Sequence, residues 1–395
     1  MRVVVHDYVG HPFQAQLART LAARGHSVLH LHCESFVTGK GRLERVADDP
    51  PSLEFEVIAL GGEFAKYDIV RRLSHELRSG RDLASHLAAF RPDVVLSSNA
   101  PLVVQALVQR WCSRSGVGFI FWQQDVISAA ARRVLGSRSR PLGVVAEQAV
   151  ASLERRLLRR SDGIVIIAGD FLPILTRWGV NEERVTVIEN WAPIDELPAL
   201  PRDNAWAREQ GLEGKAVYLY SGTLGFKHDP SLMLELARWA GGQDALVLVV
   251  SEGPGADWLG EHALPDDALR LLPYQPYERL PEVLASADVL VAVLEPDAGE
   301  FSVPSKVLTY LCAGRPLLGA LPADNLAARV IERSGGGIVV PPRDRRALVA
   351  AAEELLADSG RRGELGQAAR SYAETTFDLA EITDRFEEVL ERVRR

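Results

Sequence analysis

The residues with the clearest chemical potential stand in the stretch EFSVPSKVLTYLCAGRP, positions 300–316. Pro304 falls where a helix would begin and Gly314 where it would end, which is the usual placement of these residue types at helix ends. A helix start presents unpaired backbone N–H groups and partial positive charge, and both favour an anion such as phosphate. The stretch therefore predicts a phosphate site, with an ordinary capped surface helix as the alternative. The side chains that would add donors or charge are Ser302, Ser305 and Lys306.

Two further loops have chemistry compatible with phosphate. In YSGTLGFKHD, positions 220–229, Gly222 and Gly225 allow a ligand to approach the backbone and Lys227 supplies a flexible cation. The second loop, SEGPG at 251–255, also follows a predicted strand. Taken alone, each is equally well explained as a strand-to-helix turn. Neither contains GxGxxG, which counts against a nicotinamide or flavin enzyme.

The elements that must position these loops alternate between strands and helices along the chain. β-Branched strands recur from 2–6 to 184–190 and again from 216–222 to 336–342, with helical periodicity between them. This pattern predicts an α/β fold of two Rossmann-like, doubly wound parallel sheets, with a ligand cleft between them at the carboxyl ends of the strands. The proline- and acid-rich segment 191–204 is typical of an interdomain linker. The expected parts are an N-terminal domain (1–195), a C-terminal domain (196–375) and a final helical segment (376–395).

Composition limits the class of protein. A chain of 395 residues exceeds the size at which one core stops growing, which favours two domains. The net charge of -8 argues against a nucleic-acid binder that relies on bulk positive charge. Three cysteines far apart in sequence (Cys33, Cys112 and Cys312) form neither a zinc spacing nor a disulfide framework. No stretch approaches the roughly 20 apolar residues that span a bilayer. We therefore expect a cytoplasmic protein.

Beyond these patterns, the chain resembles a known family. The segments IENW (188–191), YSGTLGFKHD, VSEGPG, LPYQP, ADVLVAVLEP and VPSKVLTYLCAGRPLL are similar to those of retaining nucleotide-sugar glycosyltransferases of family four. The branch that includes putative colanic-acid, capsule and O-antigen transferases is the most similar. The resemblance covers essentially the whole chain and implies the GT-B fold, in which two Rossmann-like domains face each other across a cleft. It also implies that the N-terminal domain (1–195) is the acceptor side and that the C-terminal domain (196–375) binds the nucleotide sugar.

The resemblance also implies roles for individual residues. Gly222 and Lys227 would face the donor diphosphate, and Ser302, Pro304, Ser305 and Lys306 would hold its phosphates. Glu252 or Gly253 would line the nucleotide pocket, and the loop 272–275, which includes Tyr274, would meet the base. Cleavage of a sugar–phosphate bond leaves a nucleoside diphosphate whose growing charge needs preorganised donors. Two lysines and a helix start supply them, and no Asp-x-Asp pair stands in a suitable loop. We therefore expect no cofactor and no metal.

Three positions depart from the family pattern. Its paired glutamates fall at Phe301 and Thr309, and Glu300 stands beside the first of them. Thr309 lies one turn beyond Ser305 on the same helix face, but a hydroxyl cannot bind two ribose hydroxyls as a carboxylate does. The family's histidine-aspartate pair falls at Gln124 and Asp125. The candidate catalytic residues are Lys227, Asp125 and Glu300.

The sequence thus predicts a retaining glycosyltransferase that moves a hexosyl unit from a nucleoside diphosphate sugar, with UDP favoured, to a glycan or lipid-linked acceptor. The alternatives are a nucleotide-sugar 2-epimerase of similar fold and a non-catalytic nucleotide-sugar-binding partner subunit.

An arginine-rich segment at 132–160, whose only acids are Glu147 and Glu154, predicts peripheral contact with the anionic inner face of the cytoplasmic membrane or with a lipid diphosphate. A solvated helix face is the equal alternative. The resemblance further implies that the last helix, at 379–393, packs back on the first domain.

Overall fold

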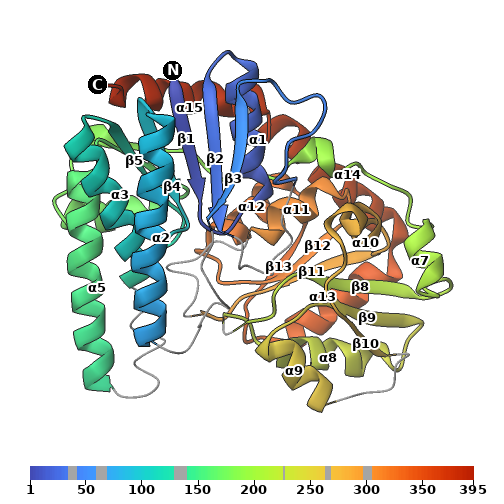
Figure 1. Ribbon diagram of the computed structural model, residues 1–395. Coiled ribbons are helices and arrows are strands. Elements are labelled where there is room, and N and C mark those ends of the chain that lie inside the picture. Colours follow the sequence, from blue (N-terminus) through green and yellow to red (C-terminus); the bar gives the residue numbers. More distant parts are fainter. Residues whose placement is uncertain (34–41, 59–68, 129–139, 226, 263–267, 297–304) are drawn as a thin grey trace. The chain divides into compact units, whose positions relative to one another are not determined.

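The structure is a computed structural model of all 395 residues. It describes residues 1–33, 42–58, 69–128, 140–225, 227–262, 268–296 and 305–395 (Figure 1). The chain divides into two compact units, each described by itself here. Unit 1 comprises Met1–Asn190 and Leu379–Arg395, and unit 2 comprises Trp191–Asp378. The chain therefore returns to unit 1 for its last helix.

Unit 1 is built on a 7-stranded parallel sheet with the order β3-β2-β1-β4-β5-β6-β7. Its central strands are almost wholly buried, as the near-continuous apolar runs of the sequence require for a sheet covered on both faces. The strands are β1 (Arg2–Asp7), β2 (Ser27–Cys33), β3 (Leu53–Ile58), β4 (Val94–Ser98), β5 (Gly118–Gln123), β6 (Gly163–Ile166) and β7 (Val185–Val187).

Helices cover both faces of this sheet. One layer contains α1 (Pro12–Ala23) and the last helix, α15 (Leu379–Val393), which contacts α1, β5 and β6. Gly118 and Gly163 allow this close approach, since a Cβ at either position would lie within 2.9 Å of Val393 atoms. The other layer contains α2 (Ile69–Phe90), α3 (Leu102–Ser115) and α5 (Arg140–Arg160), as Figure 1 shows. The short helix α6 (Leu172–Arg177) follows β6.

Unit 2 repeats this plan with a 6-stranded parallel sheet of order β10-β9-β8-β11-β12-β13. Its strands are β8 (Ala216–Ser221), β9 (Ala245–Val250), β10 (Leu269–Leu272), β11 (Val289–Val293), β12 (Leu317–Ala320) and β13 (Gly337–Val340). Its helices are α7 (Ala205–Glu209), α8 (Pro230–Ala240), α9 (Pro254–Glu261), α10 (Leu280–Ala285), α11 (Lys306–Cys312), α12 (Leu326–Ser334), α13 (Arg345–Ala357) and α14 (Ser359–Thr376).

The core of unit 2 lies between its sheet and the layer formed by α8 and α13. Tyr218, Val247 and Val291 of the strands pack there against Met233 and Leu348 of the helices. Helices α11 and α12 contact β11 and β12 from the other side (Figure 1). Burial of these apolar side chains is the main stabilising term, at about 25 cal/mol for each Å² removed from water.

Both sheets reverse their strand order at an internal position. In unit 1 the reversal falls between β1 and β4, and in unit 2 between β8 and β11. Ligands of open parallel sheets bind beyond the carboxyl ends of the strands at such a switch point. The loops that follow these four strands are therefore the places to look for a site.

The sequence prediction of two doubly wound parallel sheets is confirmed, with local differences. The last strand of unit 1 was expected over 184–190 but ends at Val187, and Asn190 turns away to pair with Gln124. Helix α10 is preceded by a 3₁₀ turn at Tyr277–Arg279 and becomes α-helical at Leu280, with Pro281 in its first turn. Three short helices, α6, α7 and α12, were not predicted.

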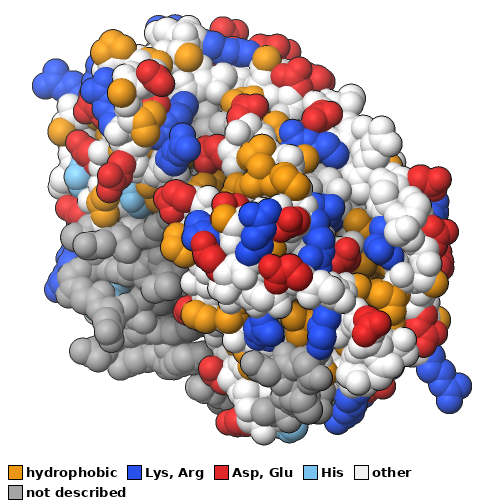
Figure 2. Space-filling model, turned by 90° about the vertical axis from the view of Figure 1, so that its right-hand side faces the viewer, with side chains coloured by type: hydrophobic (Ala, Val, Ile, Leu, Met, Phe, Trp, Pro, Cys, Tyr) orange, Lys and Arg blue, Asp and Glu red, His pale blue; other side chains and the backbone are white. Residues whose placement is uncertain are grey.

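The surface in Figure 2 interleaves acidic and basic side chains on the face that it shows. Among the described residues, no helix is long and apolar enough to cross a membrane.

Candidate active site

The loop after β8 lies at the switch point of unit 2 and is anchored at both of its ends. The N–H of Gly222 donates to the carbonyl of Val250 (3.0 Å), which continues the pairing with β9. The hydroxyl of Tyr310, on α11, accepts from the N–H of Ser221 (2.8 Å) and donates to its carbonyl (2.9 Å). Helix α11 is thereby fixed against the end of β8. The backbone φ of Gly222 is +116°, a value that strongly favours glycine.

Lys306, the first residue of α11, directs its ammonium group towards this loop. The Nζ atom lies 3.6 Å from the centroid of the Tyr220 ring, and a Cβ at Gly222 would be 3.5 Å from it. Nζ is buried and has no hydrogen-bond partner among the described residues. Burial disfavours the charged form, so the pKa of Lys306 lies well below its ordinary value. An anion bound beside Nζ would favour the charged form of this amine.

The second half of the same loop contains Lys227 and His228. The carbonyl of Lys227 accepts from the N–H of Glu295 (2.8 Å), which ties this loop to the end of β11. The Nδ1 atom of His228 accepts from the N–H of Gly225 (3.1 Å). Burial, reinforced by the charge of Lys306, lowers the pKa of His228 to about 3. His228 is therefore a neutral structural acceptor.

The loop after β9 contacts the loop after β8 and holds it in place. The hydroxyl of Ser251 accepts from the N–H of Leu224 (3.0 Å), and the N–H of Gly255 donates to the carbonyl of Leu224 (2.8 Å). Gly255 allows this contact, because a Cβ there would lie 2.6 Å from that carbonyl oxygen. Gly253, with a φ of +110°, turns the chain into α9.

Glu252 and Tyr274 complete the edge of this site. A carboxylate oxygen of Glu252 accepts from the N–H of Tyr274 (3.3 Å), and the Tyr274 hydroxyl lies 2.6 Å from the hydroxyl of Thr223. The structure therefore brings together the predicted residues of three loops with the start of α11. These residues are Gly222, Glu252, Gly253, Tyr274 and Lys306.

The structure describes only part of the stretch 300–316, which the sequence predicts to be a phosphate site. Glu300, Phe301, Ser302 and Pro304 lie outside the described residues. Ser305 precedes α11 with a helical φ and ψ of -59° and -23°, and its side chain forms no capping hydrogen bond. Thr309 is partly exposed on the same helix. The predicted helix therefore begins at Lys306, and Gly314 follows its end with a φ of +65°.

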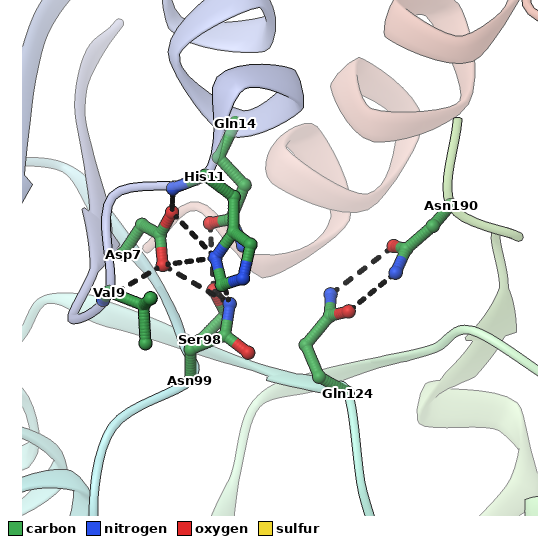
Figure 3. A network of polar contacts seen from close by, with 8 residues as sticks. All are labelled: Asp7, Val9, His11, Gln14, Ser98, Asn99, Gln124 and Asn190. Carbon is green, nitrogen blue, oxygen red and sulfur yellow. Dashed lines mark hydrogen bonds and ion pairs between the residues drawn. The ribbon is translucent and has the colours of Figure 1, made fainter. Parts of the chain in front are cut away.

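The switch point of unit 1 contains a different set of groups, centred on Asp7 at the end of β1 (Figure 3). Its side chain is fully buried, and its carboxylate accepts from the N–H of Val9 (3.2 Å), the N–H of His11 and the amide of Asn99 (3.1 Å). The ring of His11 contributes Nδ1 at 3.2 Å. Although burial alone would raise it, these contacts hold the pKa of Asp7 well below its usual range.

The loop after β5 holds Gln124 and Asp125, the other predicted site residues of unit 1. The amide of Gln124 forms two hydrogen bonds with the amide of Asn190, at 2.6 and 3.3 Å (Figure 3). Gln124 is therefore a structural residue that pairs with Asn190, and its amide side chain does not titrate. Buried Glu154, on α5, accepts from the N–H groups of Ile127 and Ser128, both at 3.0 Å, and so fixes the chain that follows Asp125.

The sequence analysis did not single out Asp7 or His11. One signal was available, because an aspartate at a strand end stood four residues before a histidine at a helix start. Asn99 could not be recognised in this way, since its φ of +53° is visible only in three dimensions. Among the described residues, no group of three or more His, Cys, Asp or Glu side chains is placed to hold a metal ion.

Comparison with known proteins identifies the family. Residues 11–191 match the glycosyl transferase 4-like domain, and residues 226–358 match the glycosyl transferases group 1 domain. The chain belongs to this family of glycosyltransferases. It is 29% identical over 282 residues to the probable glycosyltransferase WbjE of Pseudomonas aeruginosa, covering 68% of this chain and 67% of that protein. It is 24% identical over 303 residues to the putative colanic acid biosynthesis glycosyl transferase WcaI of Escherichia coli K12, with coverages of 75% and 73%.

Solved structures show the same fold. Sucrose-phosphate synthase from Thermosynechococcus elongatus aligns with a TM-score of 0.73 at 15% identity, over 99% of this chain and 98% of that one. Anabaena HepE, solved in complex with UDP-glucose, aligns with a TM-score of 0.71 at 13% identity, over 99% of both chains. The glycosyltransferase therefore has the GT-B-like architecture that the sequence resemblance implied.

Proposed function

We propose that this glycosyltransferase moves a hexosyl unit from a nucleoside diphosphate sugar, with a UDP-sugar favoured, to a glycan or lipid-linked acceptor. Transfer would retain the anomeric configuration, and the product would enter a surface polysaccharide or glycoconjugate. The relation to a putative colanic acid transferase supports the pathway, and the UDP-glucose in the structure of HepE supports the choice of donor.

The observation that carries the proposal is the buried ammonium of Lys306. Its Nζ atom has no hydrogen-bond partner among the described residues, and it lies beside Gly222. An ion held in this way is costly unless a counter-ion completes the site. A diphosphate has the charge to do so, and a ligand of this kind would restore the pKa of Lys306 towards its ordinary value.

The chemistry of the donor accounts for the remaining groups. When the bond between the anomeric carbon and the phosphate oxygen breaks, negative charge grows on the nucleoside diphosphate. Lys306 and Lys227 would stabilise that charge. Because both cations are in position before the bond breaks, they would stabilise the transition state more than the bound substrate, which lowers the activation barrier. The rim formed by Glu252 and Tyr274 would meet the nucleoside.

A panel of nucleoside diphosphate sugars tests the proposal. We expect one UDP-sugar to give nucleotide release that membrane extract stimulates, and NMR of the product to show the donor's anomeric configuration. Donor binding with neither transfer nor hydrolysis would instead identify a non-catalytic binding subunit. Conversion of the donor at its sugar C2, without nucleotide release, would identify an epimerase.

Lys227→Ala tests the position of the diphosphate separately. We expect kcat/KM for the donor to fall by about 10- to 100-fold, because one charge-assisted contact is lost. The thermal midpoint should stay within about 2 °C, because the side chain is only partly buried. An unchanged rate would mean that the diphosphate lies elsewhere.

We also propose peripheral contact with an anionic membrane through α5 and the segment before it. Val144 and Val145 are 44% and 63% exposed, and Arg155, Arg156 and Arg159 are exposed on the same helix. Exposed apolar side chains and arginines on one helix suit a lipid interface, at about 1 kcal/mol for each basic residue near the surface. Co-sedimentation with phosphatidylglycerol vesicles, but not with phosphatidylcholine vesicles, is the expected result. Equal recovery with both would contradict it.

A further inference from the structure

The hydroxyl of Tyr310 lies where two neighbouring strands of unit 2 separate. In the sheet, β8 stands between β9 and β11 (Figure 1). The pairing of β8 with β9 continues to Ser221, whereas its pairing with β11 ends at Leu219. The last residues of β8 are therefore paired with a strand on one side only, at the switch point of the sheet.

Tyr310 supplies the hydrogen bonds that a longer β11 would otherwise supply. Successive residues of a strand direct their N–H and carbonyl groups to opposite sides. Because the N–H of Gly222 donates to Val250 of β9, the N–H and carbonyl of Ser221 point away from β9. The Tyr310 hydroxyl accepts from this N–H (2.8 Å) and donates to this carbonyl (2.9 Å). A single hydroxyl can do both, since it is donor and acceptor at once.

The surroundings of Tyr310 keep its hydroxyl in the protonated form. The residue is 1% exposed, and burial raises the pKa of its hydroxyl, so the proton that is donated to the carbonyl of Ser221 is retained. Phenylalanine at this position would fill the same space and would leave both backbone groups of Ser221 without this partner. The hydroxyl can therefore be removed without a change in packing.

The same hydroxyl links the two parts of the proposed diphosphate site. Lys306 precedes Tyr310 by about one helical turn on α11, and Gly222 directly follows Ser221 at the end of β8. The Nζ atom of Lys306 would lie 3.5 Å from a Cβ at Gly222. A shift of α11 relative to β8 would change this separation directly.

The carboxyl-terminal end of α11 has its own attachment. Arg370 of α14 donates to the carbonyl of Cys312 (2.7 Å). Gly366 of the same helix approaches Gly314 so closely that a Cβ at Gly366 would lie 2.5 Å from the Gly314 carbonyl oxygen. Loss of the Tyr310 hydroxyl should therefore loosen the start of α11 while its end stays attached to α14.

We propose that Tyr310 is a positioning residue whose hydroxyl sets the separation between Lys306 and Gly222, an inference that rests on the proposed function. A diphosphate binds best when its cation and its backbone contacts are already in place, because ordering them on binding costs free energy. In this role Tyr310 acts through the two residues and not on the donor itself. Its removal should weaken donor binding and slow transfer more than it destabilises the fold.

Tyr310→Phe tests this role in the full-length protein. Calorimetric titration measures the Kd of UDP, and nucleotide release gives kcat and KM for the UDP-sugar that the donor panel selects. We expect the Kd of UDP to rise about 5- to 10-fold and kcat/KM to fall about 10- to 100-fold. Part of the loss should fall on kcat, because a displaced ammonium stabilises the leaving diphosphate less well in the transition state.

Tyr218→Phe is the matched control. Tyr218 lies on β8 as well, is buried, and donates its hydroxyl to the carbonyl of Ala352 on α13 (2.6 Å). Both variants should lower the thermal midpoint by about 2–5 °C, since each loses hydrogen bonding of one buried hydroxyl. In Tyr218→Phe, however, the Kd of UDP and kcat/KM should stay within twofold of the wild type.

A double-mutant cycle shows whether Tyr310 acts through Lys306. In a Lys306→Met background, Tyr310→Phe should lower kcat/KM by no more than about threefold, because the group that it positions is already absent. A purely structural effect would instead persist in full. The cycle therefore measures a coupling that a loss of stability alone would not produce.

The possible results separate this inference from the proposed function. If Tyr310→Phe binds UDP and turns over the donor as Tyr218→Phe does, or if its effect persists in full beside Lys306→Met, Tyr310 is not a positioning residue, even when wild-type turnover is normal. A Tyr310→Phe chain that fails to fold, beside a folded Tyr218→Phe, would show that the hydroxyl maintains the fold and would also overturn the inference. If the wild-type protein neither binds UDP nor turns over any donor, the proposed function itself fails.

Discussion

The two sheets carry opposite chemistry at equivalent positions. At the switch point of unit 1, a buried carboxylate, that of Asp7, already has its donors, which are the N–H groups of Val9 and His11 and the amide of Asn99. At the switch point of unit 2, a buried ammonium lies over a tyrosine ring and has no hydrogen-bond partner among the described residues. The same fold thus supplies one site whose charges are already paired and one that needs a ligand.

This difference indicates which unit gains more from a charged ligand. A buried carboxylate whose donors are already in place contributes to folding and to the orientation of its neighbours. An unpaired buried cation lowers stability until an anion binds, so the binding energy of that anion offsets the cost. Removal of one group at either switch point tests this difference between the units.

Removing the unpaired cation should have the largest effect on function. We expect Lys306→Met to lower kcat/KM for the UDP-sugar by about 10²- to 10³-fold, the usual result when one preorganised donor to a developing anion is lost. The thermal midpoint should stay constant or rise, because methionine fills the same space without a buried charge. Nucleotide-release kinetics and thermal unfolding measure the two effects.

Lys215→Met provides the matched control, since Lys215 stands just before β8, at the opposite end of the strand that leads to Gly222. Its activity should remain within twofold of the wild type. A large loss of stability in Lys306→Met, with activity proportional to the folded fraction, would mean that Lys306 is a structural residue and that the contrast between the units is false.

A fall in pH should destabilise unit 1 more than unit 2. Burial lowers the pKa values of His6 and His30 to about 4 and about 3, so below pH 6.5 the unfolded chain takes up protons that folded unit 1 does not. Stability is therefore lost as pH falls from 6.5, by about 1.4 kcal/mol per pH unit for each histidine. Unit 2 contains one comparable group, His228. By pH 5 unit 1 should have lost about 2 kcal/mol more than unit 2.

Hydrogen exchange measured segment by segment at pH 7 and pH 5 reports the two units separately. The pKa of His11 is raised in the folded state, so its contribution to stability is complete below pH 6.5. That contribution is lost only as pH rises through the folded-state pKa, and it does not cause a loss of stability on acidification. His30→Leu should reduce the acid sensitivity of unit 1 by about half. Equal acid loss in both units would contradict the assignment.

The sequence was sufficient for the fold because the signal was repeated. Short apolar strands alternate with amphipathic helices many times, and each repeat supports the same parallel topology. Short helices such as α7, at Ala205–Glu209, were missed because five residues carry too little periodicity. The strand expected to reach Asn190 ended early because that asparagine pairs with Gln124, a contact between residues far apart in the chain.

The site was predictable where chemistry follows a strand directly. Gly222 and Lys306 were named because a glycine after a strand and a lysine at a helix start are compatible with a phosphate ligand, and the structure places the two residues side by side. The position of the Lys306 ammonium over the ring of Tyr220 was not predictable, since α11 and β8 are far apart in the chain. The Asp7–Asn99 contact likewise joins two loops that become neighbours only when β4 pairs with β1.

The smallest predicted effect concerns how each unit holds its loops. Unit 1 fixes the chain after Asp125 with the carboxylate of Glu154, whereas unit 2 fixes its first loop by close backbone contact at Gly255. A Cβ at Gly255 would lie 2.6 Å from the carbonyl oxygen and 2.7 Å from Cγ of Leu224, so Gly255→Ala must displace that loop. We expect a loss of about 1–2 kcal/mol in unfolding free energy and about a fivefold weaker UDP affinity.

Gly260, in the same helix α9, separates this effect from helix propensity. A Cβ there would meet only Cδ1 of Leu271, at 3.9 Å, so Gly260→Ala should be neutral or stabilise the protein by about 0.5–1 kcal/mol. Denaturant unfolding and UDP titration of both variants measure the difference. If Gly255→Ala binds UDP as tightly as Gly260→Ala does, the loop after β8 does not depend on backbone contact, and the unit 2 site tolerates a displacement that a preorganised anion site would not.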